Sequence, residues 1–497
     1  MRATLVAVLA LLTFAPSALA VDEVNTSKFR KDVTVGGIMA HERALQSIAN
    51  ANGGTRASGT PGFDASAAYV SQRLKKAGYK VKQQTFDFHF FQDLAEPTLS
   101  QVSPAAKTYT TETYQYSGSG DVTAPVQPVD VVVPIGSNPP STSTSGCEAS
   151  DFDGFTAGNV ALLQRGTCDF SVKAHNAEDA GASAVIIFNE GQAGRTDLLA
   201  GTLSEDIRGI PVLGLSYADG AELVESARKQ ETKVHAFAST LNEVRPTKNV
   251  IADTKQGDPD HTLVVGSHLD SVVKGPGIND DGSGTATDLE IAETLAKDKI
   301  KPRNRVRFAF WAAEESGLVG STHYVESLSP SQVGQLFANL NFDMLGSPNY
   351  VRFVYDGDSS DAASGQIETL FNNYYASQGM QTEPTAFDGR SDYGPFLDVG
   401  VPAGGLFSGA ENEKTPEEAA IYGGTAGEPY DSCYHQACDD IHNLSTKALF
   451  ELGDGAAHAV LTLAKTKSGF FEDGSKKAGP KKKSVKARKF NGTQRKR

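Results

Sequence analysis

Five short segments of the 497-residue sequence contain side chains that could carry out chemistry, because each groups imidazoles or carboxylates within a few residues. Imidazole and carboxylate donors suit a catalytic zinc ion that keeps one position open for water. Two such ions can stabilise a hydrolytic transition state from both sides. The combination therefore predicts a two-zinc hydrolase. The segments are residues 266–270 (GSHLD), 277–282 (GINDDG), 313–316 (AEES), 341–344 (NFDM) and 433–439 (CYHQACD).

Hydrophobic runs typical of buried strands precede three of these segments. Residues 262–266 lead to His268, residues 306–312 lead to Glu314 and Glu315, and residues 340–342 lead to Asp343. A helix is expected at 288–295, between the first two runs. Strands that alternate with helices predict a mostly parallel sheet with helices on both faces. Ligands of such sheets lie at the carboxyl ends of the strands, so the candidate side chains should meet there.

The sequence before residue 95 and the sequence between 95 and 240 differ in character. The first part predicts helices at about 38–48 and 65–77 and a strand at 79–90. The second part is rich in Thr, Ser, Val, Pro and Gly, which predicts short strands and turns. Within it, buried strands are expected at 159–163 and 184–188, with a helix at 171–180 between them.

In this order and spacing, the five segments resemble the M28 family of co-catalytic zinc aminopeptidases, over about residues 36–90 and 245–465. Residues 166–170 (GTCDF) and the helix after them resemble the protease-associated (PA) domain, which family members use as a lid or recognition module. The resemblance implies an α/β fold, a mostly parallel mixed sheet flanked by helices, with an inserted β-rich PA domain. The expected parts are a signal peptide (1–20), peptidase segments (21–95 and 244–470), the PA insert (96–243) and a basic tail (471–497).

The resemblance also implies which residues hold two zinc ions. Asp280 would bridge both ions, which lets them lie about 4 Å apart. Asp270 would orient the His268 ring, because a carboxylate behind a ligand imidazole is the usual support. Either Asp439 or Asp440 would support the second ligand imidazole. The ligands are His268, Asp280 and Asp343 for the first ion and Asp280, Glu315 and His435 for the second.

Two further roles follow from the resemblance. Glu314 would be the general base that takes a proton from the attacking water, since crowded carboxylates can have a raised pKa. Tyr434 would donate a hydrogen bond to the developing oxyanion. The motif HExxH is absent from the sequence, which excludes the single-zinc plan built on that motif.

Substrate contacts are expected in two matching loops. Arg390 and Phe407 would line the pocket for the first residue, and an apolar pocket would favour leucine-like side chains. Glu314 and Asp343 could hold the free α-amine of a peptide. Apart from Arg390, no basic group in these loops stands out to bind a C-terminal carboxylate, which favours an aminopeptidase over a carboxypeptidase.

Two other function classes are suggested by parts of the sequence. A non-catalytic protein that binds through the PA domain remains an alternative, although the complete ligand set argues against it. A Ser-His-Asp hydrolase would use Ser267, His268 and Asp270, which are nearly contiguous, whereas triad members converge from distant segments.

Residues 1–20 resemble a secretory signal, and no later segment is long and apolar enough to span a membrane. A secreted or lumenal protein is compatible with disulfides. We expect local pairs, with four free thiols as the alternative. Glycosylation tripeptides begin at Asn25, Asn443 and Asn491 if the host is eukaryotic. The expected pairs are Cys147 with Cys168 and Cys433 with Cys438.

The net charge is −14, but the segment from Lys476 to Arg497 holds eleven Lys or Arg residues and no acid, so the rest carries −25. An acidic body argues against nucleic acid as a substrate. We expect peptides with a free N-terminus as substrates, two zinc ions per subunit and a monomer. Calcium is a further ion that the resemblance leaves open.

Overall fold

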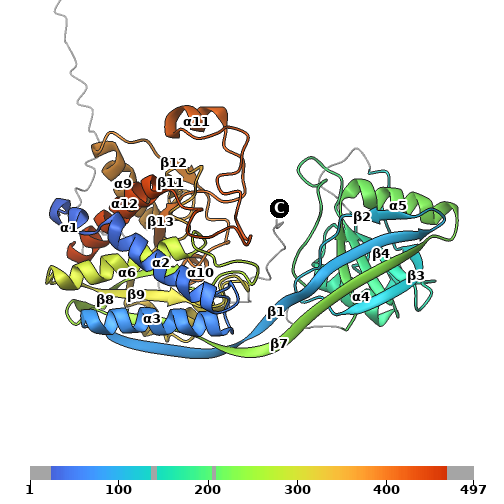
Figure 1. The fold of residues 1–497 in the computed structure, drawn as a ribbon, viewed down its shortest axis with the longest axis horizontal. Coiled ribbons are helices and arrows are strands. Elements are labelled where there is room, and N and C mark those ends of the chain that lie inside the picture. Colours follow the sequence, from blue (N-terminus) through green and yellow to red (C-terminus); the bar gives the residue numbers. More distant parts are fainter. Residues whose placement is uncertain (1–23, 136–142, 204–208, 467–497) are drawn as a thin grey trace, which may run out of the picture.

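The computed structural model describes residues 24–135, 143–203 and 209–466. The expected signal peptide (1–20), basic tail (471–497) and glycosylation tripeptide at Asn491 lie outside the described residues. Two bodies lie side by side in Figure 1, joined by a ribbon of two long antiparallel strands. These strands are β1 (Lys80–Ser103) and β7 (Lys233–Asp253). The expected domain borders, 95/96 and 243/244, fall within these continuous strands.

The large body contains a mixed sheet in the order β12-β11-β13-β10-β8-β9-β7, with β1 beside β7. Strands β13, β10, β8 and β9 are parallel, whereas β11 and β7 pair antiparallel with β13 and β9. The structure thus has the predicted mostly parallel mixed sheet. The bounds are β8 (Asp258–His268), β9 (Asn304–Trp311), β10 (Leu336–Phe342), β11 (Phe353–Tyr355), β12 (Glu383–Thr385) and β13 (Ala403–Phe407).

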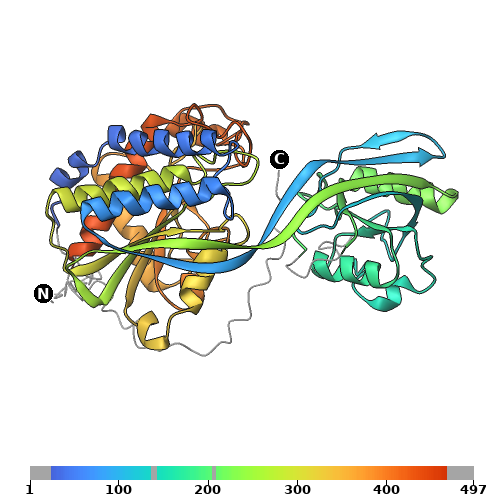
Figure 2. The ribbon, with the colours of Figure 1, turned by 60° about the horizontal axis from the view of Figure 1, so that its bottom comes forward.

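Alternation along the central strands supplies a separate core on each face of this sheet. Val265 and Phe308 belong to the larger core, whereas Val264 and Trp311 belong to a smaller one on the opposite face. In Figure 2 helices α2, α3 and α6 lie together on one side of the sheet. The helices of this body are α1 (Ser27–Asp32), α2 (Val35–Ala51), α3 (Pro61–Ala77), α6 (Gly282–Lys297), α7 (Val319–Glu326), α8 (Pro330–Val333), α9 (Ala362–Ser377), α10 (Gly394–Asp398), α11 (Pro416–Tyr422) and α12 (Thr446–Lys465).

Several of these helices begin at the residues that local chemistry favours. The hydroxyl of Thr34 accepts a hydrogen bond from Gly37 N–H, and that of Thr60 accepts one from Phe63 N–H, with Pro61 as the first helical residue. Asp281 caps α6 by accepting from Gly284 N–H. The last example matters for function, because α6 begins at the segment that contains Asp280.

The small body repeats the two-faced arrangement on a smaller scale. Its parallel strands β3, β4, β5 and β6 lie between two cores, and the strand residues alternate between them. The cysteine pair Cys147–Cys168 fastens the segment before β4 to the start of α4. The elements are β2 (Lys107–Tyr109), β3 (Gly120–Pro128), a 3-10 turn (Ala149–Phe152), β4 (Val160–Gln164), α4 (Phe170–Asp179), β5 (Ala184–Phe188), β6 (Val212–Leu215) and α5 (Tyr217–Lys229).

Within the described residues, every helix is too short or too polar to cross a membrane. Asn443 is only 8% exposed, and its amide donates to both carboxylate oxygens of Asp431. A glycan on Asn443 is therefore incompatible with the folded structure, which corrects the expectation from its tripeptide.

Candidate metal centre

The carboxyl ends of three neighbouring parallel strands bring the candidate side chains together. His268 is the last residue of β8, Asp343 follows β10 directly, and Glu314 comes three residues after the end of β9. Asp280 lies in the loop before α6, which packs against β8. Hydrophobic strands thus bury the polar groups that follow them, and His268 is only 1% exposed.

The first group of possible metal ligands surrounds His268. Its Nε2 lies 3.0 Å from Asp280 Oδ1 and 3.6 Å from Asp343 Oδ1. Burial alone would lower the pKa of this imidazole, but Glu314 and Asp343 raise it well above its ordinary value. The surplus of carboxylates around one imidazole favours a bound cation.

The second group shares Asp280 with the first. His435 Nε2 lies 3.2 Å from the other oxygen of that carboxylate, Asp280 Oδ2, and 3.1 Å from Glu315 Oε2. Burial lowers the pKa of His435, yet Glu315 and Asp280 together raise it to about 9. The two groups are therefore linked through the two oxygens of one side chain.

These separations fit the donor set of zinc. Two donors bound to one tetrahedral zinc ion at about 2.1 Å lie about 3.4 Å apart. The four separations around His268 and His435 range from 3.0 to 3.6 Å. The predicted ligands of each ion thus lie where one ion could contact all of them, and they form two of the groups of potential metal ligands among the described residues.

Glu314 and Asp270 lie next to the first group. Glu314 Oε2 is 3.9 Å from His268 Nε2, and burial raises the pKa of Glu314 well above its ordinary value. The Asp270 carboxylate is 3.8 Å from His268 Nδ1, which lies closer, at 3.1 Å, to the backbone oxygen of Asp270. Asp270 therefore supports the ring chiefly through its main chain, while its carboxylate accepts from Glu314 N–H at 3.3 Å.

Asp281 joins three of the segments that form the site. Its carboxylate accepts from the backbone N–H groups of His268 at 3.2 Å, Gly284 at 2.8 Å and Met344 at 3.1 Å. The peptide bond between Asp280 and Asp281 is cis. The interactions of Asp281 fix β8, α6 and the end of β10 relative to one another, beyond the loop-shaping role that its motif suggested.

Asp439 supports a different residue from the one expected. Its carboxylate accepts from Asn279 N–H at 2.8 Å and from Asp280 N–H at 3.0 Å, so it holds the loop of the shared carboxylate. Asp440 instead accepts from His442 N–H. The expectation that either carboxylate holds the His435 ring is therefore wrong, because the tight turn between Cys433 and Cys438 directs Asp439 toward the α6 loop.

Tyr434 and Arg390 form the border of a cavity beside the metal centre. Arg390 donates to Tyr434 Oη at 3.1 Å and to Glu411 Oε1 at 2.9 Å. The Tyr434 ring stacks on His435, with 3.8 Å between the ring centroids. Phe407 contributes to the same cavity, together with His268, Glu314 and Asp343. Both residues expected to contact substrate thus lie beside the centre.

Three supporting residues were missed by reasoning from the sequence. Arg56 is fully buried and donates to the carbonyl oxygens of Leu269, Pro276 (2.7 Å) and Gly277, which belong to the loop between His268 and Asp280. Ser391 donates to Asp343 Oδ2 at 2.5 Å. Asp392, the neighbour of Ser391 in the chain, is also buried, and burial raises its pKa to about 7. The predicted substrate loop around Arg390, which also contains Ser391 and Asp392, was the available signal, although its pattern does not indicate which side chain turns inward.

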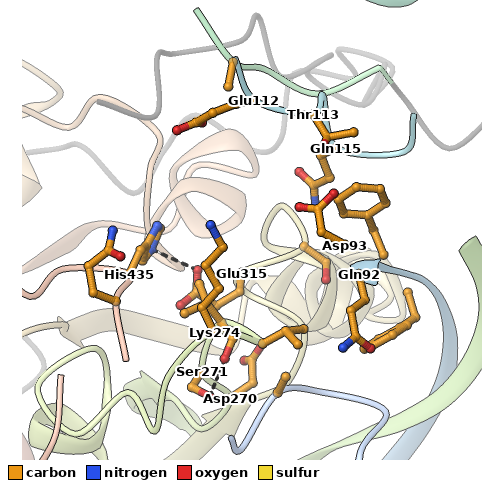
Figure 3. A pocket seen from close by; sticks show the side chains of 18 of the residues that line it. Gln92, Asp93, Glu112, Thr113, Gln115, Asp270, Ser271, Lys274, Glu315 and His435 are labelled. Carbon is orange, nitrogen blue, oxygen red and sulfur yellow. Dashed lines mark hydrogen bonds and ion pairs between the residues drawn. The ribbon is translucent and has the colours of Figure 1, made fainter. Parts of the chain in front are cut away.

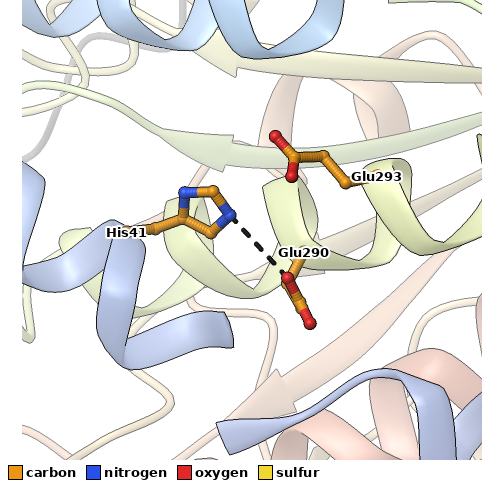
Figure 4. A group of neighbouring side chains, drawn as sticks. All are labelled: His41, Glu290 and Glu293. Atoms are coloured by element: carbon orange, nitrogen blue, oxygen red, sulfur yellow. Dashed lines mark ion pairs between the residues drawn. The ribbon is translucent and has the colours of Figure 1, made fainter. Parts of the chain in front are cut away.

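A third cluster of potential ligands lies away from the strand ends, on helices α2 and α6. Figure 4 shows His41 beside Glu290 and Glu293, with His41 Nε2 3.8 Å from Glu290 Oε2. Arg73 already binds both carboxylate oxygens of Glu293, and Tyr69 Oη lies 2.7 Å from His41 Nδ1. We therefore interpret this cluster as a structural ion-pair network.

Comparison with known proteins agrees with this geometry. Residues 249–460 match the family model of peptidase family M28, and residues 122–223 match that of the PA domain. An aminopeptidase of Pseudomonas aeruginosa strain UCBPP-PA14 is 48% identical over 417 residues, covering 82% of this chain and 76% of the relative. The chain belongs to peptidase family M28.

Other relatives and solved structures carry related names. A probable leucine aminopeptidase 2 of Aspergillus oryzae is 38% identical, covering 89% of this chain and 86% of the relative. An aminopeptidase from Aneurinibacillus sp. strain AM-1 has a TM-score of 0.71 at 26% identity, covering 89% of this chain and 97% of that one. A zinc aminopeptidase of Bacillus subtilis gives 0.61 at 26% identity, with coverages of 87% and 95%.

This M28 protein is a metalloaminopeptidase with an inserted PA domain, as predicted, and peptides are its substrates. The large body is the peptidase body, and the small body is the PA domain. Zinc is the metal that its relatives and its donor set support.

Proposed function

We propose that the chain is an exported two-zinc aminopeptidase that removes N-terminal residues, preferably leucine-like ones, from peptides. The observation that carries the proposal is the position of Asp280, whose two carboxylate oxygens face the imidazoles of His268 and His435 at 3.0 and 3.2 Å. One carboxylate between two half-sites is the arrangement of a bridging ligand. The ligands would be His268, Asp280 and Asp343 for one ion and Asp280, Glu315 and His435 for the other.

A bound zinc pair would lower the pKa of water and offset negative charge that develops on the substrate oxygen. Glu314, 3.9 Å from the imidazole of His268, would take the proton of the attacking water and return it to the leaving amine. Tyr434 would donate a hydrogen bond from its hydroxyl to the oxyanion, with Arg390 holding that hydroxyl in place. Asp270 would fix both His268 and the backbone of Glu314.

The cavity beside the centre accounts for recognition of the first residue. Glu314 and Asp343 would hold the α-amine, because both carboxylates line this cavity close to His268. Phe407, Tyr355 and Tyr393 supply apolar surface, which favours a leucine-like side chain. Arg390 is already bonded to Glu411 and Tyr434, so it is poorly placed to capture a C-terminal carboxylate, and the carboxypeptidase alternative loses its main group.

The remaining expectations belong to the same proposal. Both cysteine pairs are joined in the structure, which agrees with folding in an oxidising compartment and with export.

We propose domain borders near residues 95 and 243, within the β1–β7 ribbon. A monomer remains our proposal for the assembly state, and we propose no role for nucleic acid. The ligand groups described above account for zinc, and we assign none of them to calcium.

The first experiment compares leucine p-nitroanilide with its N-acetylated form, before and after chelation and with zinc restored. We expect cleavage of the free-amine substrate alone, its loss on chelation and its recovery with zinc. Equal cleavage of the acetylated substrate, or activity that survives complete removal of metal, would contradict the proposal.

Metal analysis of a matched pair of variants tests the shared carboxylate. Asp280→Asn should lower bound zinc below two ions per chain and abolish hydrolysis, because both half-sites lose a charged ligand. Ser283→Ala, a change in the first turn of α6 and outside the ligand set, should retain two ions. A zinc content of two in Asp280→Asn would refute the bridging role.

A further inference from the structure

The two proposed zinc sites differ in how far their imidazoles are shielded from solvent. The side chain of His268, in the first site, is 1% exposed, whereas that of His435, in the second, is 20% exposed. Figure 3 shows His435 and Glu315 directed toward each other in a second cavity beside the centre, with 3.1 Å between Nε2 and Oε2. The second site is therefore the one from which an ion can more easily escape to solvent.

His435 has a main-chain conformation that is uncommon for residues other than glycine. Its φ is +58°, in the left-handed region. Residues with a side chain stay in this region only where the surrounding structure holds them there. His268, by contrast, is the last residue of the regular strand β8. The imidazole of the second site thus needs a support that the imidazole of the first site does not.

The disulfide between Cys433 and Cys438 encloses His435. The two cysteines are five positions apart in sequence, with His435 between them. Because the S–S bond joins the chain on both sides of His435, the turn cannot open to let this residue relax to a more common conformation. The disulfide therefore orders the turn before a metal ion binds, and the ion need not supply the free energy of that ordering.

Both ends of this turn are anchored to the peptidase body by other interactions. Asp431 is 1% exposed and accepts from the side-chain amides of Asn279 at 2.6 Å and Asn443 at 2.9 Å. Asp439 is 2% exposed and accepts from the backbone N–H groups of Asn279 and Asp280. The loop that contains Asp280 should therefore keep its position when the disulfide is absent.

The first site is also independent of the turn. Its ligands His268 and Asp343 lie at the ends of β8 and β10. Asp281 links these two segments by accepting from the N–H groups of His268 and Met344. Neither hydrogen bond involves residues 433–438. Loss of the disulfide should thus disturb one ligand, His435, and leave the other four in place.

We propose that the Cys433–Cys438 disulfide positions His435, so that its formation completes the second zinc site, whereas the first site binds its ion without it. The inference rests on the proposed two-zinc function. As the S–S bond forms, the two thiols lose two electrons and two protons, and a second disulfide accepts them by becoming two thiols. The chain then gains its second ion, and with it full activity, only in an oxidising compartment.

The test measures zinc binding in a variant that lacks this disulfide. Cys433→Ser combined with Cys438→Ser should keep one tightly bound ion per chain. Its second ion should bind about 10- to 100-fold more weakly than in the wild type, the range typical of losing a support behind a metal ligand. Competition with the chromophoric chelator pyridylazoresorcinol measures both affinities. Excess zinc should restore hydrolysis of leucine p-nitroanilide, because the defect lies in occupancy of the second site.

The disulfide of the PA domain provides a matched control. Cys147→Ser combined with Cys168→Ser removes a bond of the same kind, away from both groups of zinc ligands. Both zinc affinities should stay as in the wild type, even if the melting temperature falls. Weakening of a single ion in the Cys433→Ser and Cys438→Ser variant alone is therefore an effect that a general loss of stability would not produce.

Chemical reduction replaces the variant if it does not fold. A water-soluble phosphine added to the folded, zinc-loaded wild type breaks the S–S bond, which yields two thiols, and the phosphine becomes its oxide with oxygen from water. The reduced protein should lose one ion per chain to the chelator and keep the other. Reoxidation in the presence of zinc should return the second ion.

Failure of the inference and failure of the proposed function give different results. If the protein without the disulfide held two ions as tightly as the wild type, the inference alone would be overturned. Equal weakening of both ions would overturn it as well, because the first site would then depend on the turn. A wild-type protein that binds fewer than two zinc ions, or that does not cleave leucine p-nitroanilide when loaded with zinc, would overturn the function itself.

Discussion

The peptidase body and the PA domain each contain a buried carboxylate in the segment that follows a parallel strand, but the two carboxylates have different cationic partners. In the PA domain, Glu190 follows β5 and is 1% exposed. Arg165 Nε lies 3.3 Å and Arg195 Nη1 2.5 Å from its Oε1. In the peptidase body, the ion-pair partners of Asp280 among the described residues are the imidazoles of His268 and His435.

The difference shows what separates a structural site from a metal site in similar surroundings. Guanidinium groups neutralise Glu190 permanently, so its pairs can only support the loop. Imidazoles can give up their protons and bind a metal, and the surrounding carboxylates then need positive charge. Position at a strand end is therefore not sufficient for function, because the identity of the cationic partner decides what the carboxylate can do.

The largest difference between the two bodies is expected when the carboxylate charge of Glu314 is removed from the peptidase body. Glu314→Gln should lower kcat by about 10²–10⁴-fold while zinc stays bound, since it removes the proposed general base and no proposed ligand. Stopped assays at saturating leucine p-nitroanilide, together with metal analysis, measure both quantities. Retained turnover with two zinc ions would show that another group takes the proton.

The same substitution in the PA domain should change stability instead. Glu190→Gln leaves the largely buried Arg165 without its charged partner and should cost about 3 kcal/mol of unfolding free energy. Urea unfolding followed by intrinsic fluorescence measures this loss, and kcat of the native protein should stay near the wild-type value. An unchanged unfolding midpoint would mean that the pairs with Glu190 contribute nothing.

Acid should destabilise the peptidase body through a buried histidine. Burial lowers the pKa of His41 to about 4, whereas the unfolded chain protonates near 6.5. Between these values only the unfolded state takes up the proton, so stability falls as the pH drops from 6.5 to 4, by up to about 3 kcal/mol. The melting temperature of His41→Gln should depend less on pH in this range than that of the wild type. If the melting temperatures of the two proteins changed equally with pH, His41 would not be the source of the acid sensitivity.

A smaller effect is expected at Arg390. Arg390→Lys keeps the charge but loses the geometry that serves Tyr434 and Glu411 together, and we expect kcat to fall about ten-fold. Arg195→Lys makes the same replacement in the PA domain and should leave kcat unchanged. Equal activity of both variants would show that Tyr434 is held without Arg390.

Local sequence was sufficient for the elements that contain the candidate ligands. Hydrophobic runs before His268, Glu314 and Asp343 predict strands β8, β9 and β10, because burial on both faces requires nearly continuous apolar residues. Local pairing also predicted both disulfides. The family resemblance, carried by short motifs, indicated the residues that the structure brings together around Asp280.

The length of β1, in contrast, depends on pairing with a distant strand. A strand was predicted at 79–90, yet β1 runs from Lys80 to Ser103, because it pairs along its length with β7. The partner lies about 150 residues away in sequence, and local composition holds no record of such pairing.

The donor chemistry of the site follows from the local motifs, since their imidazoles and carboxylates form a ligand set that suits zinc. Tertiary structure decided the supports: Arg56 beneath the loop of Asp280, and Asp439 on the backbone of Asp280 rather than on the ring of His435. Arginine and aspartate side chains are usually exposed to solvent. Which particular arginine or aspartate is instead buried against the backbone of a distant segment depends on the fold of the whole chain.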